Sequence, residues 1–283
     1  MYGPSAGVDG VDLVVEQGEC FGFLGPNGAG KTTFIRLALG LVRPTSGDVS
    51  VMGHDLATDR MGALGQIGYL PGELGLYATL TGRRTLDALG RLHPRPPVLR
   101  EELCAALELE PRDLGKRVRE YSRGMKQKLG LVAALQHDPP LAILDEPTGG
   151  LDPVIQARLL EWLAARSRAG RTIFFSSHVL AEVEELCDRV AMIRAGRLLF
   201  VGRLGELRGT RVRSVEVTFS EPVEPSRYAG EGVGPAQVHG LRHRFALSGD
   251  PTALLAALSL LPVADVAIER PSLEDAFRDL YAA

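Results

Sequence analysis

The chain has 283 residues, of which 45% are hydrophobic and 24% are charged. This composition excludes the disordered and fibrous classes of protein, and the length suits one large domain and one small one. The 35 acidic residues nearly balance the 32 basic residues, for a net charge of -3, so the overall charge favours neither nucleic acid nor an anionic membrane as a partner. No apolar run reaches the roughly 18 to 20 residues of a membrane-spanning helix, so we expect none.

Short apolar runs alternate with helical patterns from about residue 11 to residue 200, which predicts an α/β domain with a largely parallel, buried sheet. We expect its strands at Cys20–Leu24, Gly47–Met52, Ile67–Leu70, Leu141–Leu144, Thr172–Ser176, Val190–Ile193 and Arg197–Val201. Between Thr79 and about Gln136 the pattern is helical and charged, with a proline-rich break at His93–Pro97. This region is therefore predicted to be an inserted helical subdomain.

The pattern changes after Gly202. The segment Arg203–Arg213 is charged and contains two glycines, as expected of a linker. Beyond it we expect a loop over Ser220–Gly240, strands at Ser214–Phe219, Leu241–Leu247 and Val263–Ile268, and helices at Pro251–Leu261 and Pro271–Tyr281. The prediction is a large domain over residues 1–208, with its helical insert at about 79–136, and a small α+β domain over residues 209–283.

A phosphate-binding loop is predicted between the first expected strand and the helix after it. Residues 25–32 read Gly-Pro-Asn-Gly-Ala-Gly-Lys-Thr and fit the pattern GxxxxGK[ST]. The glycines let successive backbone N–H groups point at one anion, and the helix adds its positive N-terminal dipole. We expect Lys31 to reach the β- and γ-phosphates of a nucleotide, Thr32 to offer its hydroxyl to Mg²⁺, and Thr33 to contact the α-phosphate. The cradle itself consists of Gly25, Pro26, Asn27, Gly28, Ala29 and Gly30.

Two adjacent acids follow the apolar run Leu141–Leu144. Asp145, at the carboxyl end of a strand beside a phosphate loop, is predicted to hold Mg²⁺ through a water molecule. Glu146 then lies near the γ-phosphate and is predicted to act as the general base that activates water. Two acids with separate roles favour a hydrolase over a kinase, although the pair alone is also compatible with an exposed turn.

Two further polar residues each allow two interpretations. Asp152 precedes Pro153, so it fits the N-cap of a helix as well as a nucleotide-binding residue. His178 follows the expected strand Thr172–Ser176. It is either a catalytic residue that donates to the γ-phosphate and orients the attacking water, or a surface histidine.

Together with Tyr121-Ser-Arg-Gly-Met125 and Gly149-Gly-Leu-Asp152, these segments resemble the nucleotide-binding subunit of an ATP-binding-cassette (ABC) transporter over about Tyr2 to Val201. The resemblance implies a P-loop NTPase fold of the ABC type, ATP and Mg²⁺ as cofactors, and a homodimer that closes around two ATP molecules. It also implies that Ser122 and Gly124 contact the γ-phosphate held by the opposite subunit, that Asp152 belongs to the nucleotide-binding set, and that Tyr2 stacks on adenine.

Three features depart from the family pattern. Gly72 and Glu73 follow the Tyr-Leu-Pro end of a strand, where the family has a glutamine that links Mg²⁺ to the helical subdomain. Either Glu73 substitutes for that glutamine or the contact is absent. Arg123 replaces a glycine of the common signature and adds a positive charge close to where the resemblance would place the partner's triphosphate. The edge strand that usually precedes the stacking aromatic is missing before Tyr2.

The end of the chain resembles a subfamily. Pro271-Ser-Leu-Glu-Asp-Ala-Phe277 and the GxLxxLR run from Gly202 to Arg208 are similar to the C-terminal extension of bacterial drug-export ATPases of the daunorubicin-resistance type. This implies a Mg²⁺-dependent ATPase at the cytoplasmic face of the cell membrane that powers efflux of a drug or another small lipophilic compound through separate integral-membrane permease subunits. The alternatives are a soluble ABC ATPase without a membrane partner and a nucleotide-binding module with weak hydrolysis. No nucleic acid partner is expected, since the net charge is negative and the basic cluster within residues 116–128 suits a solvated helical face.

Overall fold

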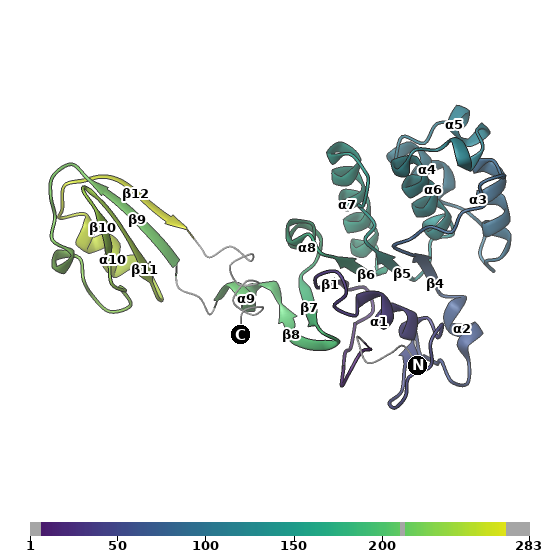
Figure 1. Ribbon diagram of the computed structural model, residues 1–283, viewed down its shortest axis with the longest axis horizontal. Coiled ribbons are helices and arrows are strands. Elements are labelled where there is room, and N and C mark those ends of the chain that lie inside the picture. The colour runs from purple at the N-terminus through teal and green to yellow at the C-terminus, as the bar shows by residue number, and fades with distance from the viewer. Residues whose placement is uncertain (1–6, 210–212, 270–283) are drawn as a thin grey trace. The chain divides into compact units, whose positions relative to one another are not determined.

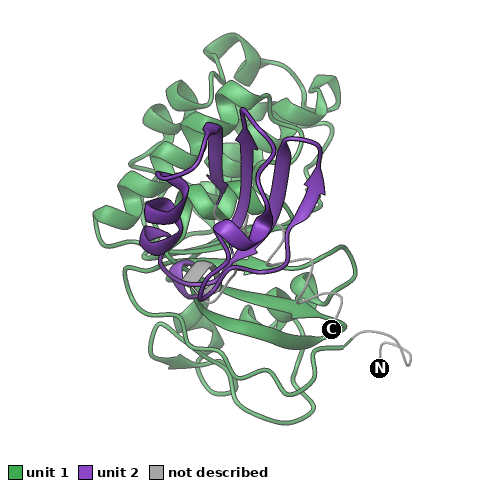
Figure 2. Cartoon of the chain, turned by 90° about the vertical axis from the view of Figure 1, so that its left-hand side faces the viewer, with its two compact units in different colours: residues 1–203 green, residues 204–283 purple. Residues whose placement is uncertain are grey.

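The computed structural model describes residues 7–209 and 213–269 (Figure 1). The chain divides into two compact units, Met1–Arg203 and Leu204–Ala283 (Figure 2). This division falls a few residues before the expected domain boundary at residue 208. In the part of the chain that the structure describes, no helix is long and apolar enough to cross a membrane.

The first unit is built on a six-stranded sheet in the order β4-β5-β6-β1-β7-β8. Its strands are β1 (Cys20–Leu24), β4 (Ile67–Leu70), β5 (Leu141–Asp145), β6 (Thr172–Ser177), β7 (Arg189–Arg194) and β8 (Arg197–Arg203). All neighbours pair in parallel except β7 and β8, which are antiparallel. Every residue of β1, β5 and β6 is buried, which explains why their apolar residues follow one another without the alternation of a half-exposed strand.

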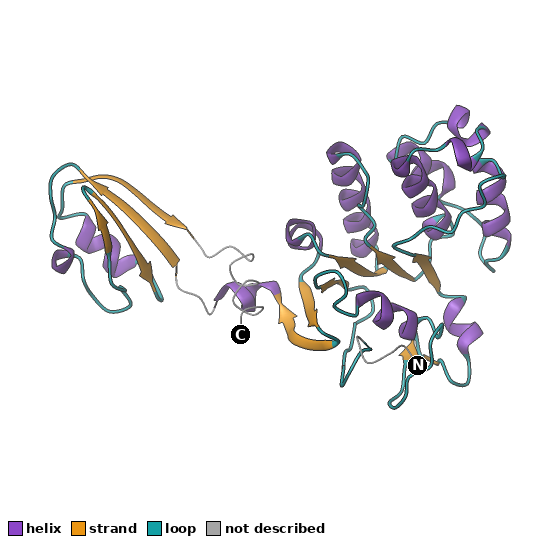
Figure 3. Cartoon of the chain, in the orientation of Figure 1, coloured by secondary structure: helices purple, strands orange, loops and turns teal. Residues whose placement is uncertain are grey.

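Helices cover both faces of this sheet (Figure 3). On one face lies α1 (Lys31–Ala38), with α7 (Pro153–Arg168) and α8 (Leu180–Leu186) on the other. The ring of Phe34 on α1 stacks on those of Phe23 and Phe174 in the sheet, with centroids 4.8 and 5.9 Å apart. Gly22 lets α8 approach β1 closely, because a Cβ there would lie 2.5 Å from Val183 Cγ1. The parallel core and its helical cover confirm the α/β prediction.

The expected helical region contains α3 (Gly82–Arg91), α4 (Arg100–Ala106), α5 (Pro111–Gly115), a 3₁₀ turn η1 (Val118–Glu120) and α6 (Arg123–Leu135). A further short helix, α2 (Arg60–Leu64), precedes β4. Helix α6 is largely buried, packs against β4, and contacts the residues that follow β5 through the side chain of Gln127.

The second unit is a four-stranded antiparallel sheet in the order β10-β11-β9-β12, with α10 (Thr252–Leu258) packed on one face. Its strands are β9 (Arg213–Phe219), β10 (Gln237–His239), β11 (Arg242–Leu247) and β12 (Val263–Glu269). Phe219, Tyr228 and Phe245 form its aromatic core, and the buried His243 shares a 2.6 Å hydrogen bond between its Nδ1 and the Tyr228 hydroxyl. This confirms a small α+β unit.

Three expected elements are corrected. Within Gly47–Met52 only Ser50–Val51 forms a strand, β2, which pairs with β3 (His54–Asp55). Gly47 and Met52, the two ends of the expected strand, have left-handed φ values of 84° and 53° and are therefore not extended. The expected linker contains a helix, α9 (Leu204–Gly209), and the expected loop Ser220–Gly240 contains a 3₁₀ turn, η2 (Pro225–Arg227), and strand β10. Both the helix predicted at Pro271–Tyr281 and the predicted adenine contact Tyr2 lie outside the described residues.

Candidate active site

The predicted phosphate loop connects β1 to α1 and borders a cavity of about 260 Å³. Residues 26–28 and 30–33 line this cavity together with Gly72, Asp145 and Glu146. Gly28 and Gly30 have φ values of 80° and 110°, which side chains rarely adopt. At Gly25 a Cβ would lie 2.6 Å from the Ile193 carbonyl oxygen. The loop therefore needs glycine for its conformation and its packing, and the structure brings these predicted residues together around one cavity.

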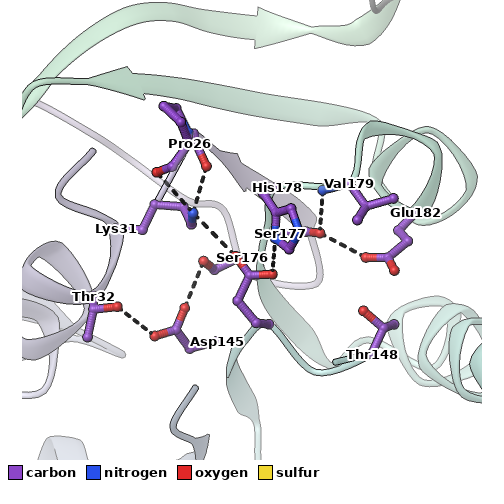
Figure 4. Close-up of polar contacts among 12 residues, drawn as sticks. Pro26, Lys31, Thr32, Asp145, Thr148, Ser176, Ser177, His178, Val179 and Glu182 are labelled. Carbon is purple, nitrogen blue, oxygen red and sulfur yellow. Dashed lines mark hydrogen bonds and ion pairs between the residues drawn. The ribbon is translucent and has the colours of Figure 1, made fainter. Parts of the chain in front are cut away.

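Lys31 lies in this cavity, and its side chain is only 7% exposed. Its ammonium donates to the backbone oxygens of Gly25 at 2.6 Å and Pro26 at 3.4 Å, and lies 3.2 Å from Glu146 Oε1 (Figure 4). A buried ammonium requires compensating negative or acceptor groups. Here the two backbone oxygens and the Glu146 carboxylate supply them, and the phosphates of a bound nucleotide could do the same.

Asp145 is 2% exposed, and both its carboxylate oxygens accept hydrogen bonds. Thr32 Oγ1 donates to Oδ2 and Ser176 Oγ donates to Oδ1, each at 3.0 Å (Figure 4). Ser176 pairs with Asp145 in the parallel register of β5 and β6. The hydroxyl of Thr32 and the carboxylate of Asp145 are hard oxygen donors of the kind that Mg²⁺ prefers, so this pair fits the metal that the family implies. Ser176 was not among the predicted site residues, because its contact with Asp145 depends on how β5 and β6 pair.

Glu146 follows β5 with a left-handed φ of 52°, which is uncommon for a residue with a side chain. Its Oε2 lies 2.6 Å from His178 Nδ1. A carboxylate only accepts hydrogen bonds, so the His178 ring carries its proton on Nδ1 when Glu146 is ionised. The structure thus brings together the predicted base and the predicted histidine, which come from the ends of neighbouring strands.

Two hydrogen bonds of Ser177 hold the turn that contains His178. Ser177 Oγ accepts from the Val179 backbone N–H at 2.9 Å and donates to Glu182 Oε2 at 2.8 Å (Figure 4). Ser177 and Glu182 are both buried. This pair fixes the backbone around His178, and nothing in the sequence pattern indicated it.

Three predicted nucleotide-binding residues, Ser122, Gly124 and Asp152, are not among the residues that line the cavity. Ser122 is the N-cap of α6 and accepts from the Met125 backbone N–H at 3.2 Å. Asp152 is the N-cap of α7 and accepts from the Ile155 backbone N–H at 3.0 Å, as its structural interpretation requires. Gly124 packs against the loop after β5, because a Cβ at Gly124 would lie 2.8 Å from the Gly150 carbonyl oxygen.

Gly72, not Glu73, borders the cavity. A Cβ at Gly72 would lie 3.3 Å from Asp145 Oδ2, whereas Glu73 is exposed and is not among the residues that line the cavity. On the strand before it, burial raises the pKa of the Tyr69 hydroxyl, and the negative charge of Asp145 adds to this rise. The space beside Asp145 therefore holds no side chain from the residue that follows Pro71.

The comparisons with known proteins agree with this geometry. A family model described as ABC transporter matches residues 8–149, a range that contains the phosphate loop, the signature segment and the acid pair. The chain belongs to the ABC transporter family. Its sheet and loop order match the expected P-loop NTPase fold of the ABC type, so both the family resemblance and the predicted fold class are confirmed.

One relative of this ABC subunit is the daunorubicin resistance ATP-binding protein DrrA3 of Streptomyces coeruleorubidus. The two are 35% identical over an alignment of 303 positions, gaps included, which covers 99% of this chain and 92% of that protein. The bacitracin transport ATP-binding protein of Bacillus licheniformis is 42% identical over 70% of this chain. An uncharacterised ABC transporter ATP-binding protein of Nostoc is 42% identical over 71% of this chain. These last two matches span only 65% and 61% of the length of those proteins.

Solved structures of the same family are also similar. The ATP-binding subunit of an ABC transporter superposes with a TM-score of 0.66 at 35% identity, covering 71% of this chain and 85% of that one. A dimeric bacterial ABC transporter cassette superposes with a TM-score of 0.64 over 70% of this chain and 90% of its own. Its identity of 22% means that it supports the fold alone.

Proposed function

We propose that this chain is a Mg²⁺-dependent ATPase subunit that powers efflux through separate membrane permease subunits. The observation that carries the proposal is the position of the Glu146 carboxylate, 2.6 Å from His178 Nδ1 and 3.2 Å from Lys31 Nζ, at the edge of the phosphate cradle. An acid held between a phosphate-binding lysine and a histidine is placed to accept a proton from water that attacks a terminal phosphate.

The residues divide into three roles. Residues 25–30 and Lys31 bind the phosphates of ATP through backbone N–H groups and one ammonium, and Thr33 contacts the α-phosphate. Thr32 and Asp145 hold Mg²⁺, which when bound neutralises charge on the phosphate oxygens. Glu146 takes the proton from the attacking water, and His178 fixes the direction of the Glu146 carboxylate through its Nδ1–H.

Two subunits are proposed to close around two ATP molecules. Ser122, Gly124 and Asp152 do not line the cavity of their own chain, and Ser122 is exposed at the N-terminus of α6. This position supports a contact with the nucleotide of the opposite subunit. Tyr2 is proposed to stack on adenine. Residues 1–208 are the proposed ABC domain and residues 209–283 its C-terminal extension.

Efflux is proposed because the chain is similar along nearly its whole length to a daunorubicin resistance protein and over two thirds of its length to a bacitracin transport protein. The cargo would be a drug or another small lipophilic compound. Since the permease would lie in the membrane, this subunit is proposed to act at the cytoplasmic face without a nucleic acid partner.

The test is ATP turnover by the purified chain and by the chain reconstituted in vesicles with a candidate permease. We expect Mg²⁺-dependent release of phosphate that rises when the permease is present and rises further with a transported compound. A chain that binds no ATP in calorimetry would overturn the proposal. Hydrolysis that the permease leaves unchanged would instead favour the soluble ATPase.

A further inference from the structure

The backbone of Glu146 needs support. Its left-handed φ of 52° lies outside the region that L-residues with side chains normally occupy. Such a conformation persists only where surrounding contacts hold it. The backbone N–H of Glu146 donates to the Ser176 carbonyl at 2.9 Å, and its carbonyl accepts from the Gly149 N–H at 3.2 Å.

A third support comes from Gln127 on α6. Its side-chain Nε2 donates to the Pro147 carbonyl at 2.8 Å and to the Glu146 carbonyl at 3.3 Å. Both acceptors are carbonyl oxygens, so only the NH₂ of the amide can face them. Gln127 is 7% exposed, and removing its donor would leave these carbonyls without that partner in a place that water reaches poorly.

The same helix contacts the segment after Glu146 at a second point. Arg123 lies four residues before Gln127, and such residues share one face of a helix. A Cβ at Gly150 would lie 3.2 to 3.3 Å from the Arg123 side chain, and Gly124 meets the Gly150 carbonyl oxygen. One rigid helix therefore supports residues 146–150 at both ends, and its N-terminus carries the signature serine.

We propose that Gln127 is a positioning residue for ATP hydrolysis. It fixes the Glu146–Pro147 peptide so that the Glu146 carboxylate stays between Lys31 and His178, and it connects the signature end of α6 to that carboxylate. The proposal rests on the proposed function, in which Glu146 is the base. Gln127 itself contacts neither the cavity nor the predicted metal ligands.

Gln156 provides a matched control on the other side of the same loop. Its Nε2 donates to the carbonyls of Thr148 and Leu151, each at 3.3 Å. It has the same amide chemistry and the same kind of acceptors as Gln127. Neither acceptor of Gln156 belongs to Glu146. A variant without the Gln156 donor therefore tests the effect of weaker support for the loop when the support of Glu146 is kept.

The experiment compares Gln127→Met and Gln127→Glu with Gln156→Met. Methionine keeps the length of the side chain and removes the donor, and glutamate keeps the shape and offers acceptors only. We expect kcat to fall between about 10-fold and 100-fold in both Gln127 variants, the range for a displaced reacting group. KM and the calorimetric affinity for ATP should stay within about twofold, and Gln156→Met should change kcat by less than about twofold.

A double-mutant cycle separates positioning from a general structural role. If Gln127 acts through Glu146, adding Gln127→Met to Glu146→Gln should cause no further loss of residual turnover, because the two changes remove the same contribution. Additive losses would overturn the proposal, as would parental kcat in both Gln127 variants or an equal loss in Gln156→Met. Should Glu146→Gln itself hydrolyse ATP at the parent rate, the proposed function fails instead.

Discussion

The substitution Glu146→Gln tests the central role in the site, because it keeps the volume of the side chain while removing its negative charge. Without a carboxylate to accept the proton of water, hydrolysis is expected to fall by about 10²-fold or more, or roughly 2.7 kcal/mol in the barrier. The same change should have the opposite effect on ATP binding. Glu146 Oε1 lies 3.2 Å from Lys31 Nζ, and the side chains of Glu146 and Lys31 are 25% and 7% exposed.

The size of the binding effect follows from this ion pair. Two unit charges at such a distance attract by about 1 kcal/mol in water and about 5 kcal/mol at the effective dielectric of a protein surface. ATP must replace this contact and must also place its phosphates beside the remaining carboxylate. Solvation of the separated charges offsets most of that energy, so we expect affinity for ATP to rise by about tenfold, or about 1.4 kcal/mol.

The assay combines calorimetry, phosphate release and size-exclusion chromatography with ATP and Mg²⁺. Glu146→Gln should accumulate as an ATP-bound dimer. The comparison is Asp145→Asn, which should weaken Mg²⁺-dependent binding as well as turnover, because Asp145 accepts from Thr32 and lies at the predicted metal position. Parental hydrolysis by Glu146→Gln would refute its role as the base, a lower ATP affinity would refute the competition for Lys31, and an inactive monomer would contradict the proposed dimer.

Three further predictions concern binding, domain organisation and acid stability. Lys31→Ala should abolish tight ATP binding in calorimetry, since it removes the ammonium buried in the cradle, and unchanged affinity would contradict the assignment of the cradle. Removing the residues beyond Arg208 should leave ATP binding intact, and a folded truncation that no longer binds would place the domain boundary elsewhere. Burial lowers the pKa of His137 from an ordinary 6.5 to about 4, and the charge of His93, whose ring stacks on it, contributes to this shift. Between pH 6.5 and 4, His137 binds a proton more readily in the unfolded chain than in the folded one. The free energy of unfolding should therefore decrease by up to about 3 kcal/mol as the pH falls through this range. In urea denaturation, the free energy of unfolding should decrease less between pH 7.5 and pH 4.5 for His137→Phe than for the parent. An equal decrease in both proteins would refute His137 as the cause.

Several features of this protein were predictable from the sequence because they depend on neighbours along the chain. The glycines of residues 25–30 and the lysine after them specify a backbone conformation within a few residues, and an apolar run that ends in Asp145 and Glu146 marks the carboxyl end of a buried strand. The same kind of pattern placed His178 just after a strand, but it left open whether this histidine is catalytic or a surface residue. These local patterns were enough to indicate the fold class and to name all the residues that line the cavity except Gly72.

Tertiary packing decided the contacts between distant residues. The hydrogen bond from Ser176 to Asp145 exists because two parallel strands pair in one particular register, and the contact of Gln127 with the Glu146 backbone exists because α6 packs beside the end of β5. Neither serine nor glutamine has a local signature, since its role depends on which acceptor the packed chain brings within about 3 Å. For the same reason Gly72, rather than the charged residue after it, borders the cavity, because the direction of the chain beyond β4 follows from packing and not from residue type.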